Sequence, residues 1–121
     1  MQIAQKNFYK KFLGRAGEVK AAEFLKKKGY KILAKNYKTH IGEIDIIAED
    51  KETVVFVEVK TRVDDAFGVP SEAVTEKKIR KYEKVATEFL IRERSLDVLC
   101  RFDVVEIENG QINHIINALS V

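Results

Sequence analysis

A chain of 121 residues with 45% apolar content has the size and composition of one globular domain with an ordinary hydrophobic core. Its single cysteine excludes an internal disulfide, and no apolar run approaches the ~20 residues of a membrane span. No apolar block typical of a signal peptide accompanies the N-terminal lysines, so we expect a single domain over residues 1–121 in the cytoplasm.

The net charge of +3 is unevenly distributed. Residues 1–38 carry eleven basic residues against two acidic ones, Glu18 and Glu23, for a net charge of +9. Residues 39–121 then carry a net charge of −6. One explanation is a surface built to bind a polyanion. The other, which is more common, is a basic helix face that is simply solvated.

The N-terminal segment has the apolar periodicity of a helix over residues 5–28. Gly29 follows a run of lysines and is a good C-terminal stop for this helix. Gly14 and Gly17 weaken the middle of the segment. The helix is therefore either broken there or begins properly near Arg15.

After this helix, alternating and apolar segments predict strands with one further helix between them. The dipeptide Asn109-Gly110 is a strong signal for a type I′ hairpin turn. The order α-β-β-β-α-β-β predicts an α/β domain. The expected elements are a helix at 5–28, strands at 30–37, 42–49 and 53–62, a helix at 71–93 capped by Ser71 after a loop with Gly68 and Pro70, and strands at 96–108 and 111–118.

The strands at 42–49 and 53–62 have one register that keeps their apolar residues on a common face. The apolar pairs in this register are Ile46 with Val57, Ala48 with Val55, and Ile44 with Val59. The same register sets Asp45 directly opposite Glu58, with Lys60 two residues further along that face. Opposite residues have Cβ atoms about 4.5–5.5 Å apart. The pattern therefore predicts two carboxylates and an amine close together.

Two carboxylates at this spacing repel each other unless a cation or a proton lies between them. Mg²⁺ or Mn²⁺ suits such a site, because Mg²⁺ binds through one or two carboxylates and keeps waters and phosphate oxygens as its other ligands. The carbonyl of Val59 is a candidate further ligand. Lys60 would orient or activate the attacking water, or neutralise developing charge. The alternative is an ordinary exposed strand face on which Glu and Lys alternate.

Five blocks of the sequence together match a known family: Gly14-Arg15-Ala16-Gly17-Glu18, Gly42-Glu43-Ile44-Asp45, Val57-Glu58-Val59-Lys60-Thr61-Arg62, Gly68 with Pro70, and Arg101-Phe102-Asp103. With these blocks the sequence resembles the bacterial YraN-like proteins. That uncharacterised family is similar to Holliday junction resolvases and to the PD-(D/E)xK nuclease superfamily. The resemblance extends from about Gly14 to Ile107, which is most of the chain.

The resemblance implies a restriction-endonuclease-like fold, with a mixed central sheet flanked by helices. It also implies that Asp45, Glu58 and Lys60 match the nuclease triad. Glu18 would match the additional helix-borne acid of the resolvases and serve as a ligand to metal or water. Ile44 stands before Asp45, where the superfamily name has a proline.

Several basic side chains are candidate contacts to nucleic-acid phosphates. They are Arg15, Arg62, Lys77, Lys78, Arg80, Lys81 and Lys84. Ion pairs with surface acids and a solvated helix face would explain these residues equally well.

Four other residues are expected to lie outside the chemistry. Asp103 is predicted to form a structural ion pair on its strand. His40 and His114 occur at no spacing typical of a metal or acid–base site. Cys100 is predicted to be a buried structural thiol rather than a reactive one.

The sequence thus predicts a Mg²⁺-dependent endonuclease that acts on DNA. Branched DNA such as a Holliday junction is a candidate substrate. We expect contacts to backbone and shape rather than base readout. Symmetric cutting of two strands would require a homodimer. The main alternative is a non-catalytic nucleic-acid-binding module of a repair or processing complex. A third is a protein-interaction role for the acidic C-terminal portion.

Overall fold

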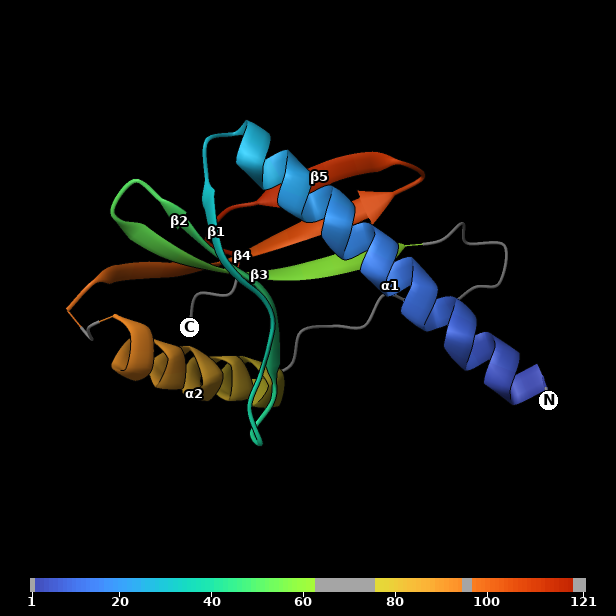
Figure 1. Cartoon of the computed structure of the whole chain (residues 1–121), viewed down its shortest axis with the longest axis horizontal. Coiled ribbons are helices and arrows are strands. Elements are labelled where there is room, and N and C mark those ends of the chain that lie inside the picture. Colours follow the sequence, from blue (N-terminus) through green and yellow to red (C-terminus); the bar gives the residue numbers. More distant parts are fainter. Residues whose placement is uncertain (1, 63–75, 95–96, 119–121) are drawn as a thin grey trace.

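The computed structural model describes residues 2–62, 76–94 and 97–118, with the side chains of its first helix described from Gly14 onwards. Two helices and five strands occupy these residues in the predicted order (Figure 1). They are α1 (Gln2–Lys27), β1 (Lys31–Lys38), β2 (Glu43–Asp50), β3 (Thr53–Arg62), α2 (Glu76–Glu93), β4 (Leu99–Glu108) and β5 (Gln111–Ile115). The expected α/β class and mixed sheet are confirmed.

The strands form one sheet in the order β1-β2-β3-β4-β5. Strands β3 and β4 are parallel, and the other neighbours are antiparallel. A parallel pair needs a long crossover, and α2 lies between β3 and β4 in the chain. Figure 1 shows α1 across one face of the sheet and α2 along the other.

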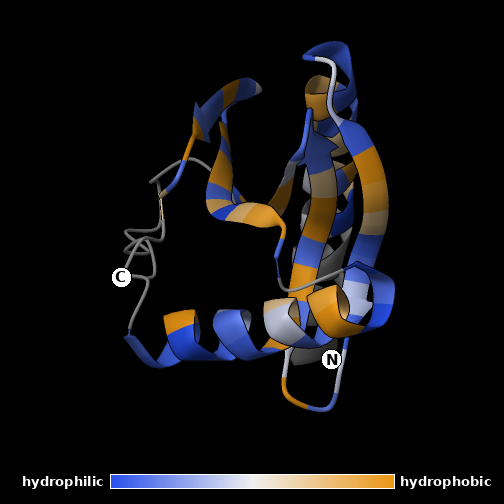
Figure 2. Ribbon diagram, turned by 90° about the vertical axis from the view of Figure 1, so that its left-hand side faces the viewer, coloured by the Kyte–Doolittle hydropathy of each residue, from blue (hydrophilic) through white to orange (hydrophobic). Residues whose placement is uncertain are grey.

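Each face of the sheet packs against one helix, which gives two hydrophobic cores. We call them the α1-side core and the α2-side core. The α1-side core contains Ala21, Ala22, Leu25, Tyr30, Ile46, Ala48, Val55, Val57, Val105 and Ile107. The α2-side core contains Ile44, Ile47, Val54, Phe56, Val85, Ala86, Phe89 and Leu90. Strand β3 contributes to both, because successive side chains point to opposite faces. Figure 2 shows hydrophobic residues along the strands, and α2 carries both hydrophobic and hydrophilic residues.

Helix α1 is continuous and begins before the predicted position, so neither a break nor a start near Arg15 is observed. Gly17 is buried at its crossing with β3. A Cβ atom at Gly17 would collide with Thr61 Oγ1, whereas one at Gly14 would meet nothing within 4 Å. Gly17 therefore marks a close approach of helix and strand, a role that the helical pattern alone does not reveal.

Helix α2 is described from Glu76, so the predicted cap at Ser71 and the loop with Gly68 and Pro70 lie outside the described residues. The Asn109-Gly110 turn is confirmed, since both residues have positive φ angles, of 50° and 79°.

Strand β4 starts at Leu99 and β5 ends at Ile115, so both are shorter than predicted. Asn117 has a φ of 56° and donates its N–H to Asp103 Oδ1 over 2.9 Å, which turns the chain away from the sheet.

Asp103 is fully buried and forms the predicted structural ion pair, with Arg101 Nε 3.1 Å from its Oδ1. His114 Nε2 lies 2.8 Å from Oδ2, and His114 Nδ1 lies 2.8 Å from Lys28 Nζ. Because a lysine ammonium can only donate, Nδ1 accepts and Nε2 donates to Asp103. Arg101 also donates to Tyr30 over 2.7 Å. This network ties the connection between α1 and β1 to β4 and β5.

Cys100 is exposed, so the prediction of a buried thiol is wrong. Although apolar residues flank it in the sequence, it lies at the end of the sheet, and burial in β4 begins only at Asp103.

In the described part of the chain, no helix is long and apolar enough to cross a membrane.

A candidate metal centre where β2 leaves β3

The β2–β3 hairpin has the predicted register over most of its length. Its pairs extend from Asp50–Thr53 to Ile46–Val57 and include Ala48–Val55. Asp45 lies one residue beyond the last pair. Its Oδ2 accepts a hydrogen bond of 2.9 Å from the N–H of Val59. A side-chain carboxylate therefore satisfies a main-chain donor of β3 at the point where the two strands separate.

The expected Ile44–Val59 contact on one apolar face is wrong, because Ile44 lies in the α2-side core and Val59 packs against the α1-side core. Ile44 and Ile47 share a face although they are three residues apart. The residues opposite them on β1, Tyr37 and Ala34, do the same.

In both strands, the alternation of side chains between the two faces of the sheet is therefore interrupted by one residue. This residue is Asp45 in β2 and Asn36 in β1. Asn36 has a φ of 51°, which accounts for the interruption in β1. Because of this interruption, Asp45 does not pair directly with Glu58 as predicted. Instead, β2 and β3 separate beyond the Ile46–Val57 pair. We call this point of separation, with Asp45, Glu58 and Val59, the β2–β3 fork.

Asp45 is a half-buried acid in a negative environment. Burial raises the pKa of its carboxyl to about 6, and the hydrogen bond from Val59 offsets part of this effect. The charges of Glu18, Glu58 and Glu43 raise the pKa further. The carboxylates of these residues are therefore close enough to repel the carboxylate of Asp45. A bound cation would reduce this repulsion.

Glu58 is the second carboxylate of the fork, and its side chain is only 11% exposed. Its Oε1 lies 2.9 Å from Lys78 Nζ on α2. Tyr82, one turn further along α2, donates its hydroxyl to Glu58; burial first and this hydrogen bond second raise the pKa of the tyrosine. Glu58 Oε2 is buried and has no hydrogen-bond partner among the described residues.

Glu18 on α1 is half-buried beside Gly17. Its burial raises the pKa of its carboxyl, a hydrogen bond from Asn36 opposes this, and Glu43 raises it again. Glu18 also acts electrostatically on Asp45. The close helix crossing at Gly17 therefore brings this helix-borne acid to the fork.

Lys60 is half-buried on β3, two residues beyond Glu58, and strand alternation puts both side chains on the same face. Arg62 donates to Glu106 on β4 over 3.1 Å, the ion pair that was the alternative to a phosphate contact. Arg15, Lys77 and Lys81 are exposed. Their contacts to nucleic acid stay predictions.

The sequence did not predict that Asn36 and Tyr82 lie at the fork. It predicted Lys78 as a phosphate contact but not its ion pair with Glu58. The spacing of Lys78 and Tyr82, four residues apart in a helix, shows that they share a helix face. That spacing does not show which strand residue the face meets.

Asp45 and Glu58 are candidate ligands for a hard divalent cation, which would bind through two carboxylates rather than in a closed cage. Within the described part of the chain, no three His, Cys, Asp or Glu side chains form a group that could hold a metal ion. Mg²⁺ needs only one or two carboxylates, with water and phosphate oxygens completing its shell. Asp45 and the unpartnered Oε2 of Glu58 supply such oxygens, and the carbonyl of Val59 is a candidate third.

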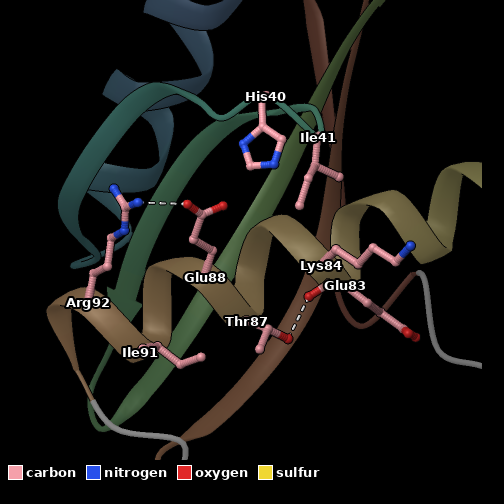
Figure 3. Close-up of a pocket in the computed structure, with 8 residues that line it drawn as sticks. All are labelled: His40, Ile41, Glu83, Lys84, Thr87, Glu88, Ile91 and Arg92. Carbon is pink, nitrogen blue, oxygen red and sulfur yellow. Dashed lines mark hydrogen bonds and ion pairs between the residues drawn. The ribbon is translucent and has the colours of Figure 1, made fainter.

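A separate groove of about 550 Å³ lies between α2 and the β1–β2 turn (Figure 3). It is lined by His40, Ile41, Glu83, Lys84, Thr87, Glu88, Ile91 and Arg92. Glu88 pairs with Arg92 over 2.9 Å, and Thr87 donates to the carbonyl of Glu83. These contacts are internal to α2, and the groove adds nothing to the fork.

Comparisons with known proteins place this chain in a family. Residues 17–107 match the sequence model described as "Uncharacterised protein family UPF0102". A UPF0102 protein of Caldicellulosiruptor saccharolyticus is 48% identical over 108 residues, which cover 89% of this chain and 92% of the relative. One of Geobacter metallireducens is 44% identical over 119 residues, covering 95% and 98%. The residues matched by the family model include Glu18, Asp45, Glu58 and Lys60.

Proposed function

Because the chain belongs to the uncharacterised protein family UPF0102, whose name supplies no reaction, we propose from the site itself that the protein is a metal-dependent endonuclease that hydrolyses phosphodiester bonds in DNA. The observation that carries the proposal is the half-buried, electrostatically coupled pair Asp45 and Glu58, with Lys60 two residues further along β3. Buried acids that destabilise one another are uncommon unless they serve a function.

In this proposal Asp45, Glu58 and the carbonyl of Val59 hold Mg²⁺ or Mn²⁺. A divalent cation bound there supplies a Lewis acid for the scissile phosphate and lowers the pKa of bound water. Lys60 orients or activates the attacking water, or neutralises charge that develops on the phosphate. Glu18 holds a water or the metal from the α1 side. The hydrogen bond from Val59 to Asp45 and the electrostatic action of Glu18 and Glu58 on Asp45 support these roles.

DNA is the proposed substrate, with branched junctions as the favoured form and the cytoplasm as the compartment. Exposed basic side chains on both helices, among them Arg15, Lys77 and Lys81, would contact phosphates without reading bases. Cutting two strands of a junction symmetrically would require two copies of the site, so a homodimer belongs to this form of the proposal.

One observation favours the alternative of a non-catalytic nucleic-acid-binding module. Lys78 already neutralises Glu58 at 2.9 Å, so the site has an internal cation in the absence of metal. A module of this kind would bind DNA with its carboxylates permanently paired. The two functions differ in whether DNA is cut.

Cleavage assays separate the two functions. Purified protein is incubated with duplex, single-stranded and four-way-junction DNA in Mg²⁺ or Mn²⁺. We expect cleavage by the wild type and by the control Glu52→Gln, which lies in the exposed turn of the same hairpin. Asp45→Asn should abolish cleavage, and Lys60→Ala should slow it by about 100-fold or more. Cleavage that survives both substitutions would contradict the catalytic proposal. Binding without cleavage of any substrate would support the module.

A further inference from the structure

Lys78 was predicted as one of several contacts to the DNA backbone, but it lies inside the fork. It is in the first turn of α2, and its ammonium is 2.9 Å from Glu58 Oε1. The same ammonium is 6.0 Å from the ring centroid of Tyr82. The side chain of Lys78 is one-third exposed, whereas that of Glu58 is nearly buried. Lys78 therefore reaches Glu58 from the solvent side of the site.

This ion pair and a divalent cation compete for one carboxylate. A cation on the unpartnered Oε2 of Glu58 would stand close to the ammonium on Oε1, because the two oxygens belong to the same group. Two positive charges at that separation repel each other. The lysine is the partner that can move, since its stem is flexible and its end is near solvent.

An anion near the fork would attract the displaced ammonium, and the proposed substrate carries one. A phosphate at the fork would lie beside both the metal site and the position of Lys78. Transfer of Lys78 from Glu58 to a phosphate would free the carboxylate for the metal and pair the ammonium with the DNA in the same event.

We propose that Lys78 couples metal binding to DNA binding: its ion pair with Glu58 weakens the affinity for a divalent cation, and DNA restores that affinity by taking over the ammonium. This inference rests on the proposed function. It deepens that function by making Lys78 a positioning residue that regulates the occupancy of the site. Linkage requires the coupling to be reciprocal, so the cation strengthens DNA binding by the same factor.

The first test is calorimetric titration with Mn²⁺ in the absence of DNA. Lys78→Met keeps the length of the stem and removes the charge, so it should bind Mn²⁺ about 10-fold more tightly than wild type, within the usual range of coupling. Lys78→Arg keeps the charge and should bind Mn²⁺ as weakly as wild type. Lys84→Met is the matched control, because Lys84 is an exposed lysine further along the same helix. Asp45→Asn added to Lys78→Met should abolish the tight binding.

The second test measures DNA affinity by fluorescence anisotropy with and without Mn²⁺. Lys60→Ala serves as the background, so that cleavage is slowed by about 100-fold or more and binding is measured before the DNA is cut. We expect Mn²⁺ to raise the affinity for duplex DNA about 10-fold, and Lys78→Met to remove this increase. If Lys78→Met does not fold, Lys78→Gln takes its place in both tests.

The outcomes distinguish this inference from the function on which it rests. Equal Mn²⁺ affinity in wild type and Lys78→Met would overturn the coupling and leave the metal site standing. No heat of Mn²⁺ binding in any variant would overturn the metal site, and the coupling with it. Tighter binding that persists after Asp45→Asn would place the Mn²⁺ elsewhere and also overturn the coupling.

Discussion

The ionised form of Asp45 lowers the free energy of unfolding of the protein. Its pKa is about 6 in the folded protein against an ordinary value of 3.8, first of all because it is buried. Between these values the folded protein keeps a proton that the unfolded chain releases. Stability attributable to Asp45 is therefore highest at low pH, falls as the pH rises from about 4 to 6, and is lost above that window.

We expect Asp45→Asn to remove this pH dependence, because an amide does not titrate. Each pKa unit corresponds to about 1.4 kcal/mol, and at pH 4 the carboxyl of the unfolded chain is already more than half ionised, so the variant should gain about 2.4 kcal/mol relative to wild type between pH 4 and pH 7. Urea unfolding at both pH values, without divalent cations, measures the difference. Glu52→Gln should follow the wild type. Parallel pH profiles for wild type and Asp45→Asn would show that the carboxyl titrates normally.

The principal acids of the site were predictable from residue patterns, whereas their partners were not. Apolar alternation in adjacent strands correctly gave the hairpin register up to the Ile46–Val57 pair, which brings Asp45 and Glu58 to the same end of the hairpin, but it did not give the fork that follows. Lys78 and Tyr82 reach the fork from α2, after the crossover, and no local pattern determines which strand residue a helix face meets. The exposure of Cys100 depends likewise on where the helices stop covering the sheet.

At the scale of elements, the crossing of α1 over β3 controls how Glu18 approaches the fork. Gly17 is the contact point, with Thr61 Oγ1 directly beneath the position of a Cβ atom. The same helix has a second glycine, Gly14, that faces open space. The two glycines weaken the helix equally by propensity, so substitutions at them separate packing from propensity.

We expect Gly17→Ala to destabilise the protein by about 1–3 kcal/mol through overpacking, despite the better helix propensity of alanine. Gly14→Ala should instead be neutral or stabilising by up to about 1 kcal/mol. Chemical denaturation measures both. Adding Thr61→Ala should recover much of the loss in Gly17→Ala, as a positive coupling in a double-mutant cycle. Additive effects would place the strain at another contact.

The skipped residue in β1 and β2 is the element-scale feature that sequence patterns missed. Ile44, Ile46 and Ala48 alternate regularly in the sequence and predict one face. Regular alternation assumes extended backbone throughout, and the positive φ of Asn36 on the neighbouring strand breaks that assumption. Asparagine tolerates this conformation better than most residues, which is a weak sequence signal for the fork.

At the scale of the whole molecule, the two cores are separated by a single sheet and share its central strands. Val55 and Val57 of β3 belong to the α1-side core, and Val54 and Phe56 to the α2-side core. Loss of either helix would expose one apolar face of the same strands. The sheet therefore links both helices into one cooperative unit.

We expect Leu25→Ala on α1 and Phe89→Ala on α2 each to lower stability by about 2–5 kcal/mol, because both side chains are buried. Each variant should still unfold in a single transition, with coincident far-ultraviolet circular dichroism and tyrosine fluorescence curves. Ile91→Ala, at a position 63% exposed, is the control and should change little. A separate early transition in Phe89→Ala would indicate that α2 detaches on its own.

The fold class and element order followed from periodicity and turn residues, because the chain alternates between patterns of different period. The parallel pairing of β3 with β4 has no local signal. It depends on the path of the chain through α2, and the register that sets Lys60 beside Glu106 follows from that path.

The exposed thiol at the start of β4 makes the protein convenient for spectroscopy. Cys100 is the only cysteine of the chain, so a maleimide fluorophore would attach at one position without mutagenesis. Cys100 lies beside Val54, four residues before Glu58 on β3, which corresponds to about 13 Å along the strand. A dye there would be near enough to exchange energy with a labelled DNA end, yet outside the fork, and would report association in real time.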